Sequence, residues 1–191
     1  SLGFVFVGSA HGEIVPSILQ TMMEREPSDL NDKWMRFMAL GLALLFLGKQ
    51  DEADATIETL KAIEHPVSRD AQILVDACSY AGTGNVLKIQ TLLHYCAEHV
   101  SAEKKEDTDE KRETDEQPHD LYQSYAVLAI ALIAMGEDVG AEMTLRHMSH
   151  LMHYGDPVIR RTVPLALALL NPSNPVITVL DTLSKYSHDS D

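Results

Sequence analysis

The residues best suited to metal binding in this sequence are its histidines and cysteines. His147, His150 and His153 follow one another at intervals of three residues. Two of them can share a helix face, but the third is rotated well away, so one helix does not focus all three on a single ion. A second group mixes faces in the same way: His94, Cys96 and His99. We therefore predict ordinary histidines, with no metal site and no cofactor.

The sequence also lacks the motifs of common catalytic sites. The GTGN stretch at residues 82–85 has no following Lys-Ser/Thr pair to grip phosphate and magnesium, so we interpret it as a turn between helices. No GxSxG elbow is present, and no Ser or Cys pairs with a His in a recognisable pattern. The carboxylates lie in polar stretches, where nothing raises their pKa toward acid–base catalysis. We predict that the protein is not an enzyme; a deep pocket with convergent polar groups would contradict this.

One acidic pattern could instead serve binding. The segment EIVPSILQTMME places apolar residues on one side of a helix: Ile14, Val15, Ile18, Leu19, Met22 and Met23. Spacings of four, three and four residues place a polar stripe on the opposite side: Glu13, Ser17, Gln20 and Glu24. Such a stripe is typical of a solvated outer helix, and it also suits a docking face for a basic partner.

The elements that would carry this stripe belong to a repeated unit. The unit is an apolar helix rich in small residues, a turn, and an amphipathic helix. Its copies begin LGFVFVGSAHGEI, MALGLALLFLGKQDE, ILVDACSYAGTGNV, AVLAIALIAMGEDV and VPLALALLNPSNPV. The turns fall at Gly8, Gly48, Gly82, Gly136 and Asn171, which are 40, 34, 54 and 35 residues apart. Three of these spacings match a two-helix solenoid repeat.

The long third spacing indicates an insertion. Residues 101–120 read SAEKKEDTDEKRETDEQPHD, nearly all charged or polar and without hydrophobic periodicity. We expect a disordered acidic loop there, either a tolerated surface insertion or an interaction tail.

The first helix of each copy is apolar nearly all round, so neighbouring copies must cover it. Small residues let adjacent backbones approach: Gly41, Ala43, Ala126, Ala129, Ala131, Ala166 and Ala168. A glycine after each such helix suits a left-handed cap. We therefore predict an all-α fold, an α-α superhelix, in which residues 1–191 form a single helical-repeat segment of a larger solenoid or toroid.

Composition narrows the classes of partner. The formal net charge of −14 argues against nucleic acid and against an anionic membrane surface. It favours a partner with basic patches, or it simply keeps the protein soluble. The longest apolar run, near residues 40–47, is too short to span a membrane, and two cysteines in apolar helices favour a reducing intracellular compartment.

The repeat resembles the proteasome/cyclosome repeat. Three segments resemble one family more closely, that of proteasome non-ATPase regulatory subunit 2, the large scaffold in the base of the regulatory particle. They are TGNVLKIQTLLHYC, IALIAMGEDVGAEMTLRHMSHLMHYGDPVIRRTVPLALAL and LDTLSKYSHDSD. The resemblance covers essentially the whole chain outside the insertion, where the family also carries an acidic loop of variable length.

The resemblance implies a non-catalytic scaffold in the cytoplasm and nucleus. The family docks ubiquitin, the ubiquitin-like domains of shuttle receptors and a deubiquitinase, and it contacts proteasomal ATPase subunits and other regulatory-particle subunits. Glu13, Gln20 and Glu24 fall where the family carries its acidic ubiquitin-binding pattern, and Gln20 departs from an all-acidic version. The family's site also uses a preceding helix.

Two alternatives remain open at this point. The chain could be a purely structural segment that builds the ring while partners bind elsewhere. It could also belong to the paralogous large scaffold of the particle or to the repeat-bearing cyclosome subunit, although the LDTLSKYSHDSD ending favours neither.

Overall fold

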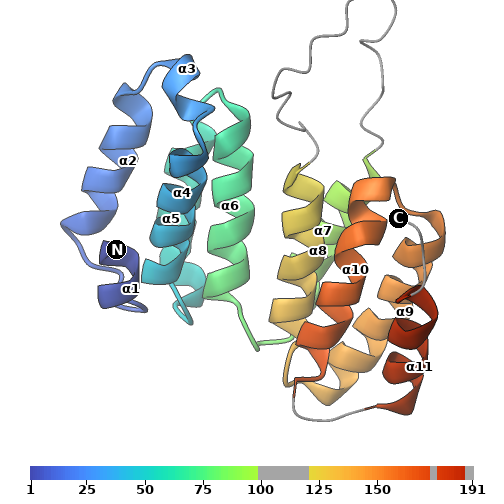
Figure 1. The fold of residues 1–191 in the computed structure, drawn as a ribbon. Helices are drawn as coiled ribbons and strands as arrows, with labels where there is room; N and C mark the ends of the chain where they lie inside the picture. The colour runs from blue at the N-terminus through green and yellow to red at the C-terminus, as the bar shows by residue number, and fades with distance from the viewer. Residues whose placement is uncertain (99–120, 173–175, 188–191) are drawn as a thin grey trace, which may run out of the picture.

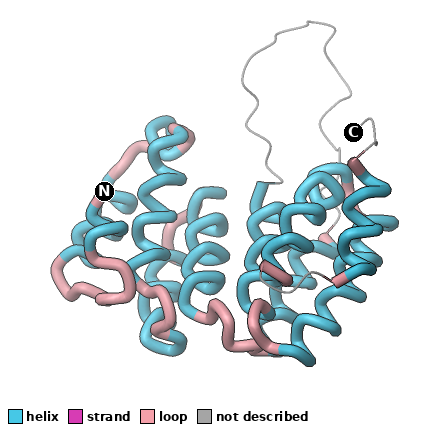
Figure 2. Tube along the Cα trace, turned by 60° about the horizontal axis from the view of Figure 1, so that its bottom comes forward, coloured by secondary structure: helices cyan, strands magenta, loops and turns pink. Residues whose placement is uncertain are grey.

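The computed structural model describes residues 1–98, 121–172 and 176–187, and these residues form helices and no strand (Figures 1 and 2). The predicted insertion, residues 101–120, lies outside the described residues. The helices are α1 (Leu2–Val5), α2 (Ile14–Glu24), α3 (Pro27–Leu30), α4 (Lys33–Leu45), the 3-10 helix η1 (Gln50–Ala53), α5 (Asp54–Lys61), α6 (Pro66–Ser79), α7 (Val86–Ala97), α8 (Leu121–Ala134), α9 (Asp138–Tyr154), α10 (Pro157–Leu170) and α11 (Ile177–Tyr186). No helix in this part of the chain has the length and apolarity needed to cross a membrane.

The first helices of the five copies form one row. Helix α1 packs on α4, α4 on α6, α6 on α8 and α8 on α10. The second helices cover this row, and four of them pack on the first helix of the following copy: α2 on α4, α5 on α6, α7 on α8 and α9 on α10. This arrangement confirms an all-α helical-repeat segment in which the copies bury one another's apolar faces. Closure into a toroid stays a prediction.

Helix α8 shows why the copies must stack. Its sequence, LYQSYAVLAIALIA, is apolar on every side, and nine of its fourteen residues are buried. Ala126, Ala129 and Ala131 are at most 1% exposed, as expected for close packing against α6 and α10. Ala168 on α10 was assigned to the same role, and this is wrong: it lies on the exposed side of α10.

The turns between the two helices of each copy also link the copies. Gly8, Gly48, Gly82 and Gly136 all adopt positive φ, between 66° and 85°, which confirms the left-handed turns. The amide of Gly8 donates to the Leu44 carbonyl at 2.9 Å, and that of Gly82 donates to the Leu132 carbonyl at 2.9 Å. Each bond joins a turn to the end of the next copy's first helix, whose last carbonyls lack partners within the helix.

The fifth turn is different. Asn171, which stands at the glycine position, has φ −131° and ψ 57° and is not left-handed. Pro172 follows it, and a proline disfavours the helical conformation at the preceding residue. The predicted left-handed turn is therefore present at the four glycines, and the copy in which Asn171-Pro172 replaces the glycine turns differently.

Candidate docking surface

The acidic stripe predicted on the first copy lies on α2. Its four members are exposed, and Val15, Leu19 and Met22 are buried on the opposite side against α4. The Gln20 amide donates to the Glu24 carboxylate at 2.7 Å, so these two side chains are held together one turn apart. Glu13 precedes the helix as its N-cap residue. The 3.6-residue period therefore placed the stripe on the correct side of the helix.

Met23 was predicted on the buried side, and this is wrong. Its side chain is 53% exposed. It lies three residues after Gln20 and beside Glu24, and exposed Pro16 lies seven residues before it, on the same flank of the stripe. The apolar run Met22-Met23 is wider than the buried face of α2, so one of its two members must leave the core. The stripe thus has an apolar edge as well as carboxylates.

The carboxylates of the stripe carry uncompensated charge. Within the described residues, no lysine, arginine or histidine forms an ion pair with Glu13 or Glu24. Acidic residues of the following copy are different: Lys49 lies 3.5 Å from Glu52, and Lys61 lies 2.6 Å from Glu58. The stripe on α2 therefore presents free negative charge to a partner.

A polar groove lies between α5, α6 and α7. Its charges are already paired: the Lys88 ammonium lies 2.7 Å from Asp76 and 4.0 Å from Asp54. Burial raises the pKa of the Asp76 carboxyl, and Lys88 opposes that rise. The Tyr80 hydroxyl donates to Asp51 at 2.6 Å. This network ties copy two to copy three.

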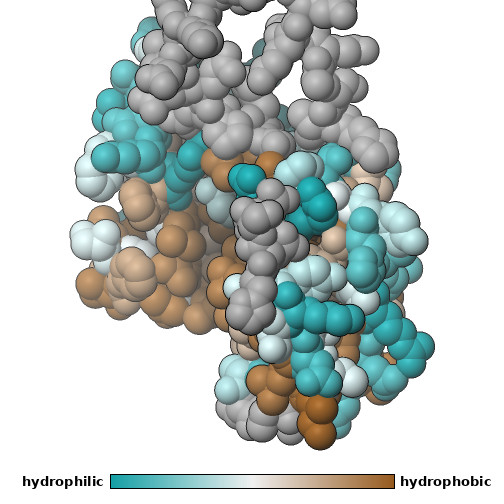
Figure 3. Space-filling model, turned by 45° about the vertical axis from the view of Figure 1, so that its right-hand side comes forward, coloured by the Kyte–Doolittle hydropathy of each residue, from teal (hydrophilic) through white to brown (hydrophobic). Residues whose placement is uncertain are grey.

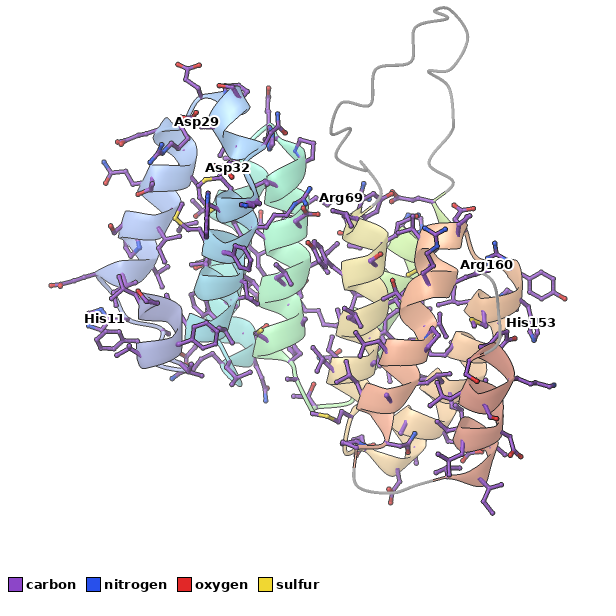
Figure 4. All side chains as sticks on the ribbon, viewed as in Figure 1. His11, Asp29, Asp32, Arg69, His153 and Arg160 are labelled. Atoms are coloured by element: carbon purple, nitrogen blue, oxygen red, sulfur yellow. The ribbon has the colours of Figure 1, made fainter. Side chains whose placement is uncertain are left out.

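The sequence candidates for chemistry do not come together. His147 is half-buried on α9, whereas His150 and His153 are exposed and contact the Tyr154 ring. Figure 4 shows His11 and His153 on opposite sides of the molecule. No group of three potential ligands that could hold a metal ion occurs among the residues with described positions.

The second candidate group is divided as well. His94 is exposed and Cys96 is buried on the other side of α7, and His99 lies outside the described residues. Burial raises the pKa of the Cys78 thiol to about 11 and that of Cys96 to about 12. Neither cysteine is therefore a thiolate nucleophile at neutral pH.

The GTGN segment at residues 82–85 is a turn, as predicted. Gly82 and Gly84 adopt φ of 71° and 63°. The Asn85 side chain accepts from the amides of Leu87 and Lys88 at 3.1 and 3.2 Å, so it caps the start of α7.

Hydrophobic side chains also reach the surface. Figure 3 shows hydrophilic residues over most of the C-terminal half of the face in view and hydrophobic residues gathered low on the N-terminal half. Several exposed apolar residues lie on α1 and α4: Leu2, Phe4, Val5, Trp34 and Phe37.

Comparison with known proteins gives the family. No protein-family model matches the chain. Over all 191 residues the chain is 61% identical to 26S proteasome regulatory subunit rpn1 of Schizosaccharomyces pombe, of which it covers 20%. It is 55% identical over 190 residues to the rpn-1 regulatory subunit of Neurospora crassa, again covering 20%. It is 46% identical over 191 residues to 26S proteasome non-ATPase regulatory subunit 2 of Dictyostelium discoideum, covering 19%.

The chain thus spans about a fifth of the length of the curated relatives it matches, and the match extends over 99–100% of its own residues. The names of these relatives describe regulatory rather than catalytic subunits. The 191 residues belong to the family of 26S proteasome regulatory subunit Rpn1, also named non-ATPase regulatory subunit 2.

Proposed function

We propose that this chain is a non-catalytic scaffold and docking segment of the proteasome regulatory particle, and that its α2 stripe binds ubiquitin and ubiquitin-like domains of shuttle receptors or a deubiquitinase. The observation that carries the proposal is the uncompensated negative charge of Glu13 and Glu24 on an exposed helix face. Family membership supports a place beside the other regulatory-particle subunits, including the ATPases, in the cytoplasm and nucleus.

The proposed chemistry is a short acidic line that meets a basic surface. Glu13 and Glu24 attract lysines and arginines of the partner and orient it. The exposed Met23 side chain, beside Gln20 and Glu24, supplies an adaptable apolar contact at the same place. A single helix buries far less than a standard interface, so we expect weak binding that gains strength when linked ubiquitins bind several such faces.

The test is a titration of the full 191-residue chain, followed by NMR, with ubiquitin and separately with a ubiquitin-like domain. We expect the α2 amides to shift, and we expect the double variant Glu13→Lys/Glu24→Lys to lose those shifts. Gln20→Glu should strengthen binding because it adds a third carboxylate to the line.

The matched control is Glu64→Lys/Asp181→Lys, which changes the net charge by the same amount at two exposed residues away from α2. Binding by the control and not by the α2 variant supports the site. If both double variants bind like the unaltered chain, or if the unaltered chain does not bind at millimolar concentration, the segment is purely structural and the proposal is wrong.

A further inference from the structure

The residues on either side of residues 99–120 form a dense polar and aromatic cluster. At its centre is Arg69 on α6, whose guanidinium donates to both carboxylate oxygens of Glu98, at 2.7 and 2.6 Å. The same guanidinium lies over the Tyr122 ring at 4.0 Å and over the Tyr95 ring at 4.7 Å, measured to the ring centroids. Figure 4 shows Arg69 between α6 and α8. Charge-assisted hydrogen bonds from one Arg69 nitrogen to both Glu98 oxygens, together with two cation–π contacts, make a strong, directional junction.

Further contacts of Tyr122 and one more residue, Gln123, complete the cluster. The Tyr122 hydroxyl donates to Glu98 at 3.0 Å, and the Tyr95 and Tyr122 rings meet edge to face at 87°. The Gln123 amide is fully buried and donates to the carbonyls of Tyr95 and Glu98 at 3.2 and 2.6 Å. Gln123 therefore caps the end of α7 from the first turn of α8.

These contacts join the end of α7 to the start of α8 through side chains. Glu98 directly follows α7, and Tyr122 and Gln123 lie in the first turn of α8. Arg69 belongs to a third helix, α6. The junction therefore joins α8 to both helices of the preceding copy, α6 and α7. Hydrogen bonds from Arg69 and Tyr122 outweigh the effect of burial and hold the pKa of the Glu98 carboxyl below its usual value, which keeps it ionised at neutral pH.

We propose a side-chain clamp that holds α7 and α8 in register without the covalent link through residues 99–120. Its members are Arg69, Tyr95, Glu98, Tyr122 and Gln123. The clamp makes the repeat stack independent of that segment, so a change of length, a bound partner or a chain break there does not open the stack. The physical basis is that five side chains hold the end of α7 against the start of α8, and that loop-closure entropy varies slowly with loop length.

The experiment divides the chain at residue 110 and co-expresses residues 1–110 and 111–191 as separate polypeptides. We expect a one-to-one complex that copurifies. At about 1 mM, a concentration comparable to that of the tethered ends in the intact chain, its unfolding midpoint should lie within about 5 °C of that of the intact chain, since about 1 kcal/mol corresponds to roughly 2–4 °C at this size. Dissociation of the two pieces, or failure to recover the complex, overturns the clamp.

The variant Arg69→Ala distinguishes a specific role of the clamp from a general contribution of Arg69 to packing. In the divided protein this variant should abolish copurification or lower the midpoint far more than it does in the intact chain. Arg69→Lys keeps the charge but loses the planar guanidinium that lies over the Tyr95 and Tyr122 rings, so its midpoint in the divided protein should fall between those of Arg69→Ala and the unaltered sequence.

The matched control is Leu19→Ala, a core truncation on α2 away from the clamp. It should lower the midpoint of intact and divided proteins equally. If Arg69→Ala behaves like Leu19→Ala, with no extra loss in the divided protein, Arg69 is an ordinary stabilising residue and the clamp is wrong.

Discussion

Asp70 shows how one residue can work against the stability of its surroundings. Its side chain is 9% exposed on α6, and the nearest Arg36 nitrogen is 3.9 Å away. Burial raises the pKa of the carboxyl to about 6, against the opposing effects of Arg36 and Arg69, so the expectation that no carboxylate has a raised pKa is wrong for Asp70. The folded state therefore binds the Asp70 proton more tightly than the unfolded state, whose aspartate pKa is about 3.9. Asp70 therefore destabilises the fold least when it is protonated, below about pH 4. The destabilisation grows as the pH rises toward 6 and the buried carboxyl ionises.

We expect Asp70→Asn to raise the free energy of unfolding at pH 7.5 by up to about 3 kcal/mol, because the buried charge is removed and about two pKa units separate the two states. Below about pH 4 the variant and the unaltered chain should be equally stable. Urea unfolding at several pH values between 4 and 8 measures this. A variant that is less stable at pH 7.5 would show that the pairing with Arg36 outweighs the desolvation of Asp70.

At the residue scale, the sequence predicted the exposure of Glu13, Gln20 and Glu24 but not their electrostatic surroundings. The exposure of these residues follows from the helical period alone. Whether their negative charge is neutralised depends on which lysines and arginines other elements bring close. Arg69 and Glu98 are 29 residues apart, and no spacing rule links them. The exposure of Met23 could not be predicted either, because periodicity does not say how wide a face of α2 the neighbouring helix covers.

At the scale of elements, α1 and α4 cross at two glycines. A Cβ added to Gly3 would lie 2.5 Å from the Gly41 carbonyl oxygen, whereas one added to Gly41 would have nothing from outside its own helix within 4 Å. Gly41 was predicted as a close-contact residue, but the residue that must lack a side chain is Gly3. A sequence pattern identifies small residues without telling which of two crossing backbones needs the space.

The two glycines should therefore respond oppositely to alanine. Gly3→Ala should lower the free energy of unfolding by about 1–3 kcal/mol, because the methyl group meets rigid backbone. Gly41→Ala should raise it by up to about 1 kcal/mol, because alanine favours a helix interior. Urea denaturation of both variants tests this, and a similar loss in both would mean that the crossing is symmetric.

The two-helix units and four of their turns were predictable because they depend on local sequence: the periodicity of apolar residues and a glycine after each apolar helix. Three features were not: the added 3-10 helix η1 before α5, the backbone conformation of Asn171 (φ −131°, ψ 57°), and the packing of four second helices on the first helix of the following copy. These depend on neighbours in space. The clamp around Arg69 belongs to the same class, since its members come from α6, α8 and the end of α7.

At the scale of the whole molecule, the buried residues form two hydrophobic cores that share α6. Val67, Ala71 and Val75 of α6 belong to a core with α2, α4 and α5, whereas Ile73 and Ala77 belong to a core with α7 to α11. The side-by-side placement of α6 and α8 joins the two halves (Figure 1). Stability in such a stack is a sum of unit and nearest-neighbour terms, so the two cores need not unfold together.

We therefore expect local damage to remain local. Leu42→Ala removes a fully buried side chain from the first core and should cost about 2–5 kcal/mol. Hydrogen exchange followed by mass spectrometry should show amides of α2, α4 and α5 exchanging at least about tenfold faster, with a smaller change in α8 and α10.

Ile130→Ala, in the second core, is the reciprocal variant and should reverse this pattern. Helix α6 should respond to both, because it contributes buried side chains to each core. An equal acceleration across all helices in both variants would instead mean that α6 transmits every loss and that the five copies unfold as a single cooperative unit. The two variants together therefore measure how strongly the α6–α8 contact couples the two cores. The first core belongs to the half with the α2 stripe, and the second to the half that begins with α7.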